Sequence, residues 1–144
     1  MRDSVLYLST AACWLVLAAI AWRSARAAAG SAPVPAKTFP VEGALLPVAL
    51  VLHGMLVWNA ILTDDGLNLG VANAISLIVW LTVAIYWLAS LAVPGLASIQ
   101  GLWAPIALLA VLMQAVLPSN YLVHYGGDPL FSVHFAIAML AYSL

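Results

Sequence analysis

Three histidines stand out by their chemistry from an otherwise apolar chain: His53, His124 and His134. Imidazole is the commonest side-chain ligand for metals and titrates near neutral pH. His53 lies near the middle of a long apolar run, and an ionisable residue at membrane depth is by default a functional candidate. Two roles remain open for it. It is either a neutral imidazole hydrogen-bonded to a neighbouring helix, or a metal or haem ligand or proton relay.

The other two histidines belong to the last stretch, where a polar turn runs into an apolar segment. Ala138 and Tyr142 follow His134 at i+4 and i+8, so the three residues share one helix face. The small side chain of Ala138 would leave room for a flat ligand to approach the imidazole. His124, four residues before Asp128, either faces water or is a second polar partner for a ligand at the same level.

Other chemistries are less well matched by the spacing. A zinc site needs three or four ligands at fixed local spacing, whereas His124 and His134 are ten residues apart without Cys or Glu nearby. Nothing in the spacing supports a Ser-His-Asp triad. Haem needs only one or two histidines and an apolar, aromatic cleft. The six tryptophans and five tyrosines can line such a cleft, but membrane-interface positions explain most of them equally well.

The composition indicates that lipid is the solvent. Of 144 residues, 66% are hydrophobic and only 6% are charged, whereas soluble domains carry about 25% charged residues. The net charge of −1 and the lack of a basic stripe argue against nucleic acid as a partner. Cys13 is the only cysteine, so the chain has neither an internal disulfide nor a Cys-based metal site.

The pattern predicts an all-α, polytopic membrane protein that forms a single domain, with four full transmembrane helices and the start of a fifth. The expected spans are residues 5–22, 44–62, 71–91, 102–117 and 130–144, and residues 23–43 are expected to be a proline-rich loop. The last run is shorter than the roughly 20 residues that a span needs. We therefore expect the sequence to be the N-terminal portion of a longer protein.

The basic residues set the expected orientation. Arg23, Arg26 and Lys37 lie in the first predicted loop, which the positive-inside rule places in the cytoplasm, with the N-terminus outside. In the third span, Asn73, Ser76 and Trp80 share one helix face. This face is expected either to hydrogen-bond neighbouring helices or to form one wall of a ligand cavity.

The last stretch resembles a known family. The segment from His134 to Tyr142 is similar to the His-x7-Tyr signature of cytochrome c assembly proteins of the CcsA/CcmC type, and most similar to the CcsA-like branch (YpjD and HemX type). Further motifs of that branch have counterparts in Leu52-His53-Gly54, Gly66-Leu67-Asn68, Asn73-Ala-Ile-Ser76-Leu77 and Pro118-Ser-Asn-Tyr-Leu-Val-His124. The resemblance covers roughly residues 44–144.

The resemblance implies a multi-pass protein of the bacterial inner membrane that binds or delivers haem at the extracytoplasmic face. His134 would be the axial ligand of the haem iron, with His53, His124 and Tyr142 as further cofactor-binding groups. A Trp-rich loop and a second external histidine would follow Leu144. The partners would be lipid, haem and other cytochrome c maturation proteins or apocytochrome, and the role would be haem presentation rather than enzymatic catalysis. The alternative is a transporter or structural subunit whose polar residues line a proton or solute path.

Overall fold

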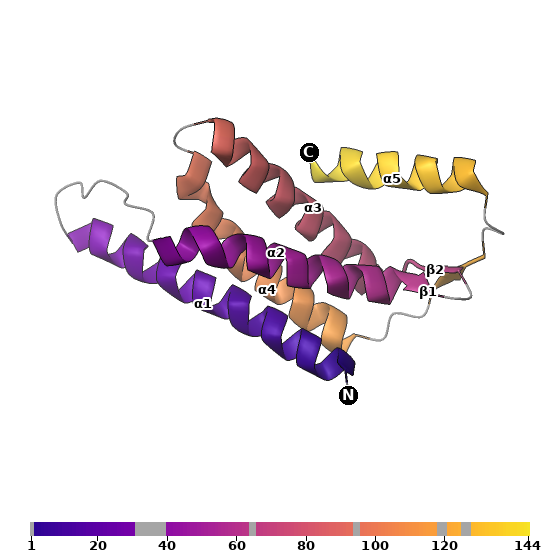
Figure 1. Cartoon of the computed structure of the whole chain (residues 1–144), viewed down its shortest axis with the longest axis horizontal. Coiled ribbons are helices and arrows are strands. Elements are labelled where there is room, and N and C mark those ends of the chain that lie inside the picture. The colour runs from indigo at the N-terminus through magenta and orange to yellow at the C-terminus, as the bar shows by residue number, and fades with distance from the viewer. Residues whose placement is uncertain (1, 31–39, 64–65, 94–95, 118–120, 125–127) are drawn as a thin grey trace.

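Five α-helices and a small antiparallel sheet make up the part of the chain that the computed structural model describes (Figure 1). The described residues are 2–30, 40–63, 66–93, 96–117, 121–124 and 128–144. The helices are α1 (Arg2–Gly30), α2 (Pro40–Ile61), α3 (Val71–Ala92), α4 (Gln100–Val116) and α5 (Pro129–Ser143), and a short 3₁₀ turn, Leu96–Ile99, leads into α4.

The first two helices are longer than the sequence predicts. Helix α1 continues through Arg23 and Arg26, because the alanines that follow favour helix and no proline interrupts before Pro33. Arg26 places its guanidinium 4.9 Å from the ring centre of Trp22, one turn earlier. Helix α2 begins at Pro40 rather than near residue 44. The predicted loop 23–43 is therefore too long. Lys37, with the rest of 31–39, lies outside the described residues.

In the described part of the chain, three helices are long and apolar enough to cross a membrane: they contain the segments Ser4–Arg26, Gly43–Ile61 and Val71–Ala92. Helices α4 and α5 are apolar but shorter, so length singles out three helices where the sequence predicts four full spans. The start of α5 follows from local chemistry. Asp128 accepts a hydrogen bond from the backbone N–H of Leu130 at 2.9 Å, and Pro129 occupies the first turn, where its missing N–H costs little.

A three-stranded sheet joins two interhelical connections, a feature that the all-α prediction did not include. Its strands are β1 (Leu62–Thr63), β2 (Gly66–Asn68) and β3 (Leu122–Val123), paired antiparallel in that order. Leu67 is the central residue, paired with Leu62 on one side and Val123 on the other. The sheet therefore ties the α2–α3 connection to the segment that follows α4.

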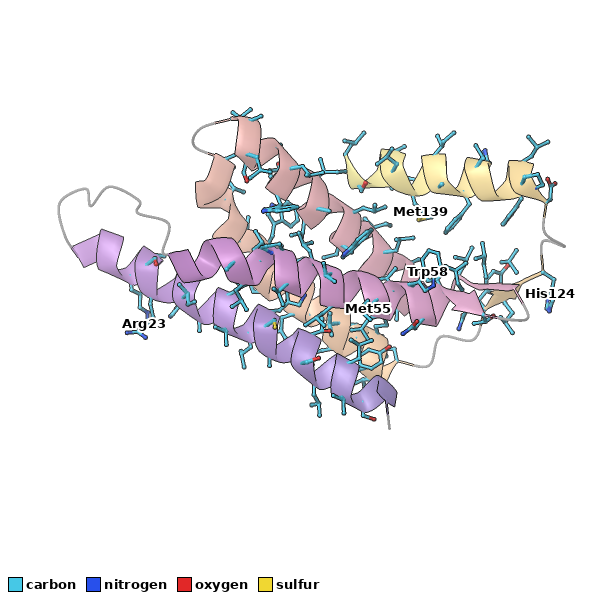
Figure 2. All side chains as sticks on the ribbon, viewed as in Figure 1. Arg23, Met55, Trp58, His124 and Met139 are labelled. Atoms are coloured by element: carbon cyan, nitrogen blue, oxygen red, sulfur yellow. The ribbon has the colours of Figure 1, made fainter. Side chains whose placement is uncertain are left out.

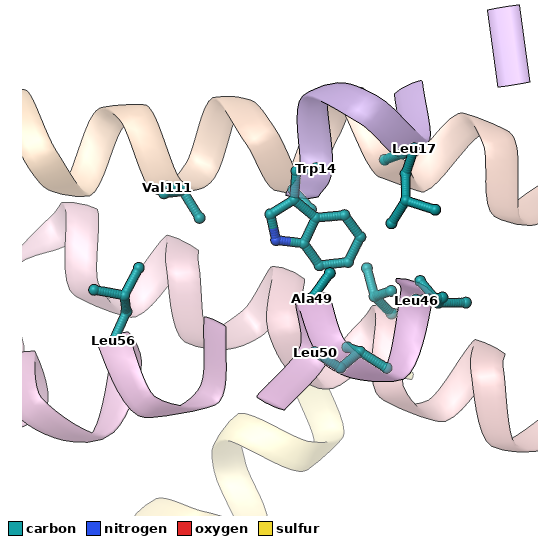
Figure 3. Packing of buried hydrophobic residues seen from close by; sticks show 10 residues of the cluster. Trp14, Leu17, Leu46, Ala49, Leu50, Leu56 and Val111 are labelled. Atoms are coloured by element: carbon teal, nitrogen blue, oxygen red, sulfur yellow. The ribbon is translucent and has the colours of Figure 1, made fainter. Parts of the chain in front are cut away.

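The first four helices form one bundle. Helix α1 packs against α2 and α4, α3 packs against the same two helices, and α5 contacts α3 (Figure 1). Trp14 is fully buried in the bundle core, and Leu46, Ala49 and Val111 belong to the same cluster (Figure 3). Phe131 and Phe135 attach α5 to a second cluster, formed by Val57, Ile61 and Leu67.

Candidate functional site

A chain of hydrogen-bonded polar side chains crosses the bundle from α2 to α4. His53 Nε2 lies 2.9 Å from Ser76 Oγ, and Ser76 Oγ donates to Gln114 Oε1 at 2.9 Å. Gln114 Nε2 then donates to Asn73 Oδ1 at 3.2 Å. All four side chains are buried, with His53 and Ser76 completely inaccessible. We call these four residues the polar network.

The polar network continues into the small sheet. Asn73 Nδ2 donates to the backbone oxygens of Ala60 at 3.3 Å and Asn68 at 3.1 Å. Asn68 in turn accepts, through Oδ1, from the backbone N–H of Tyr121 at 3.2 Å. Because Asn68 belongs to β2, the sheet and the interior of the bundle share one set of hydrogen bonds. This arrangement fixes Asn73 more firmly than a single interhelical contact would.

The remaining surroundings of His53 are apolar and aromatic. Its ring meets the indole of Trp14 on α1 edge to face, with ring centres 5.9 Å apart and an interplanar angle of 79°. Both His53 Nδ1 and Trp14 Nε1 are buried and have no hydrogen-bond partner among the described residues. A buried polar atom without a hydrogen-bond partner lowers the stability of the folded state. His53 Nδ1 and Trp14 Nε1 are therefore the atoms at this contact that a further hydrogen-bonding group could stabilise.

Trp80 lies outside the polar network although it shares a helix face with Asn73 and Ser76. Its Nε1 donates to the backbone oxygen of Leu50 at 2.8 Å. Its indole also lies against Gly54, where an added Cβ would come within 3.0–3.2 Å of the ring. A groove of about 390 Å³ runs between α2 and α3, lined by Val51, Gly54, Met55, Trp58, Asn59 and Trp80. All three residues of this face therefore hydrogen-bond neighbouring elements, and Trp80 also lines the groove.

The predicted haem-binding residues of the last stretch lie on the outside of α5. His134 is exposed, Ala138 is half-buried and the side chain of Tyr142 is 75% exposed. Helix α5 spans all three residues, so their common face exists as predicted. The same helix turns Phe131 and Phe135 toward the bundle and is attached at its end by Thr82 Oγ1, which donates to the backbone oxygen of Ser143 at 3.1 Å.

The structure does not bring the three histidines together. His53 is enclosed by α1, α2 and α3, whereas His134 is exposed on α5. His124 directly follows β3 and is exposed at the end of the molecule that carries the sheet (Figure 2). Residues 118–120 and 125–127 of the predicted polar turn lie outside the described residues.

Of the residues at the central site, only His53 was a predicted site residue, and Asn73 and Ser76 were predicted as part of one helix face. Gln114, which bridges Ser76 and Asn73, and Trp14, which packs on His53, were not predicted. The sequence did contain one signal for Gln114. A polar amide inside an apolar run most often points toward a neighbouring helix. The sequence contained no such signal for Trp14, because an indole in an apolar run also suits the core or the membrane interface.

The residues that could hold a metal ion or haem are few in the described part of the chain. No three of its His, Cys, Asp or Glu side chains gather into a metal-binding group, but haem brings its own four nitrogens and needs one or two axial ligands. The exposed His134, with the small Ala138 one turn below it, suits one axial position.

Comparison of the chain with protein-family models, with curated proteins and with solved structures gave no match.

Proposed function

We propose that the chain belongs to a polytopic membrane protein of the cytochrome c assembly type, which binds haem at the extracytoplasmic face. One observation carries the proposal: on the apolar helix α5, the exposed His134 is followed at i+4 by the small, half-buried Ala138 and at i+8 by the exposed Tyr142. When bound, the haem supplies the redox-active group that is passed to an acceptor. His134 would hold the iron, and Tyr142, two turns away, would flank the ring.

The surroundings of this face also favour an apolar guest. Val133 and Ile137 on α5 are exposed, and no charged side chain lies between Pro129 and Leu144. His124 is exposed at the sheet end of the bundle, from which α5 starts (Figure 2). It is the candidate for a second polar contact. The protein would thus present haem to an apocytochrome or another maturation protein, which requires no catalytic residue in this segment.

The test is a visible spectrum of the full-length protein purified from cells supplied with haem. We expect a Soret band that is lost or shifted in His134→Ala and retained in Ser90→Ala, a polar substitution on α3. A spectrum without a Soret band, or one that is unchanged by His134→Ala, would refute the ligand assignment. His53→Leu should leave the band in place, since His53 is fully buried away from α5.

A polar path through the bundle is the second candidate, and the polar network is the observation that favours it. Its four side chains link α2, α3 and α4 within the segments that would lie in lipid. Two of the four are amides, however, which do not readily pass on a proton. Measurements of proton or solute uptake in sealed vesicles distinguish this candidate from haem binding. A path through the polar network requires that His53→Leu abolish the uptake.

A further inference from the structure

The polar network determines which nitrogen of His53 carries its proton. The argument starts at Asn73, whose Nδ2 contacts the backbone oxygens of Ala60 and Asn68. Both oxygens can only accept, so the amide must turn its N–H groups toward them. Asn73 Oδ1 therefore faces Gln114 and can only accept there. The orientation of the Asn73 side chain is fixed by backbone atoms and does not depend on His53.

The orientation of Asn73 determines the orientation of each following member of the network. Gln114 must donate to Asn73 Oδ1 through Nε2, which leaves Oε1 facing Ser76. The hydroxyl of Ser76 has one proton, and that proton is used on Gln114 Oε1 at 2.9 Å. Ser76 Oγ can then only accept from His53 Nε2, which lies 2.9 Å away. His53 is consequently the Nε2–H tautomer, and its lone pair is on Nδ1.

The Nδ1 lone pair lies in a place where a large or charged guest does not fit. His53 and Trp14 are both fully buried, and His53 is not part of the groove between α2 and α3. Among the residues that the structure describes, no charged side chain is buried, so a cation would lack a counter-charge there. A small, neutral hydrogen-bond donor is the guest that suits these surroundings.

A hydroxyl group suits them best because two unpartnered nitrogens share the interface between α1 and α2. Trp14 Nε1–H needs an acceptor and His53 Nδ1 needs a donor, and a hydroxyl group can act as either one. Figure 3 shows the indole nitrogen directed toward the side on which Leu56 and Val111 lie. His53 is one turn before Leu56 on α2. Thr10, one turn before Trp14, already donates its hydroxyl proton to Leu6 O at 2.7 Å.

We propose that Asn73, Gln114 and Ser76 are positioning residues that hold His53 as the Nε2–H tautomer, so that its Nδ1 lone pair binds a small hydroxyl donor in the α1–α2 interface. The inference concerns the bundle interior and does not depend on haem binding at α5. The ¹⁵N NMR spectrum of the full chain in phosphatidylcholine bilayers tests it, with ¹⁵N-labelled His and Trp. This lipid has no hydroxyl group, so water is the probe. The double variant His124→Gln, His134→Gln leaves only the signal of His53.

The expected spectrum shows His53 protonated on Nε2, with a hydrogen-bonded Nδ1 that receives magnetisation from water protons. A dominant Nδ1–H tautomer would overturn the positioning role. An Nδ1 that is free of hydrogen bonds, or that receives magnetisation only from Trp14 Hε1, would overturn the hydroxyl site. These outcomes are read from the native bundle and need no variant of the polar network.

Variants of the network test the positioning step separately. In Gln114→Leu, the Ser76 hydroxyl is released and can donate to His53 Nε2, so we expect the Nδ1–H tautomer to become detectable. Thr82→Val is the matched control, because it also removes one interhelical hydrogen bond of α3 but lies outside the network. A Gln114→Leu protein that keeps only the Nε2–H tautomer would contradict the assignment of Gln114 as a positioning residue.

Discussion

Gln114 connects two other members of the polar network. It accepts from Ser76 and donates to Asn73, so Gln114→Leu leaves two buried groups without their partner. We expect it to lower the free energy of unfolding by about 1–3 kcal/mol. His53→Leu should cost less, since Ser76 keeps Gln114 as its acceptor. Reversible unfolding of both variants in mixed micelles measures the difference. A larger cost for His53→Leu would mean that Gln114 is not central.

At the residue scale, the sequence predicted which side chains would be buried better than it predicted their partners. Asn73 and Ser76 were assigned to one helix face by their spacing, and that face does meet neighbouring helices. Their partners Gln114 and His53 belong to other helices, and the rotation of one helix against another is decided by packing rather than by local pattern. This is also why the contact between His53 and Trp14 could not be predicted.

At the scale of elements, the small sheet depends on Gly66. Its φ of +138° is in the region that favours glycine, and an added Cβ would lie 2.6 Å from the backbone oxygen of Val123. Gly66→Ala should therefore separate β2 from β3 and cost about 1–3 kcal/mol. Gly43→Ala is the control, because no atom lies within 4 Å of its added Cβ in α2. That change should be neutral or stabilise the helix by up to about 1 kcal/mol.

Hydrogen exchange of the backbone amides reports on both glycine variants. The amide of Leu69, which donates to Tyr121 O at 2.8 Å beside the sheet, should exchange faster in Gly66→Ala and unchanged in Gly43→Ala. Equal protection of Leu69 in the two variants would show that the sheet does not depend on the glycine conformation.

The elements differ in how far local sequence determines them. The predicted span 71–91 agrees with α3 within one residue, because a long apolar run between polar turns is a strong helical signal. The strands contain only two or three residues each, fewer than an alternating pattern needs to be visible. They form because the packed helices bring two connections together. The proline-rich loop was predicted too long since prolines mark only the segment that they occupy, and α1 and α2 extend toward them from both sides.

At the scale of the molecule, the outer surface is as informative as the core. Every helix leaves large apolar side chains exposed, among them Leu8 at 72%, Trp58 at 67%, Leu88 at 57%, Leu109 at 59% and Ile137 at 62%. A surface of this kind is unfavourable in water at roughly 25 cal/mol for each Å² but suits a bilayer. Within the bundle, the buried polar side chains His53, Asn73, Ser76 and Gln114 are instead hydrogen-bonded to one another. This distribution is the physical basis for proposing a membrane protein.

The proposed topology follows from this surface together with the basic residues. Arg23 and Arg26 are exposed near the end of α1, whereas the sheet lies at the opposite end of the bundle (Figure 1). If the arginines face the cytoplasm, the sheet and the start of α5 face outside. Single cysteines at Arg26, Thr63 and Val93, each in a Cys13→Ala background, test the arrangement with a membrane-impermeant maleimide.

In intact spheroplasts we expect Thr63→Cys to be labelled, and Arg26→Cys and Val93→Cys to react only after lysis. The reason is that α2 and α3 would each cross the bilayer in the proposed topology, so that Thr63 would lie on the opposite side from the other two positions. The reverse pattern would invert the orientation and place His134 on the cytoplasmic side, which contradicts extracytoplasmic haem binding. Labelling of all three positions from one side would show that α2 and α3 do not span the membrane. In that case the exposed apolar surface would have to be covered by protein instead of lipid.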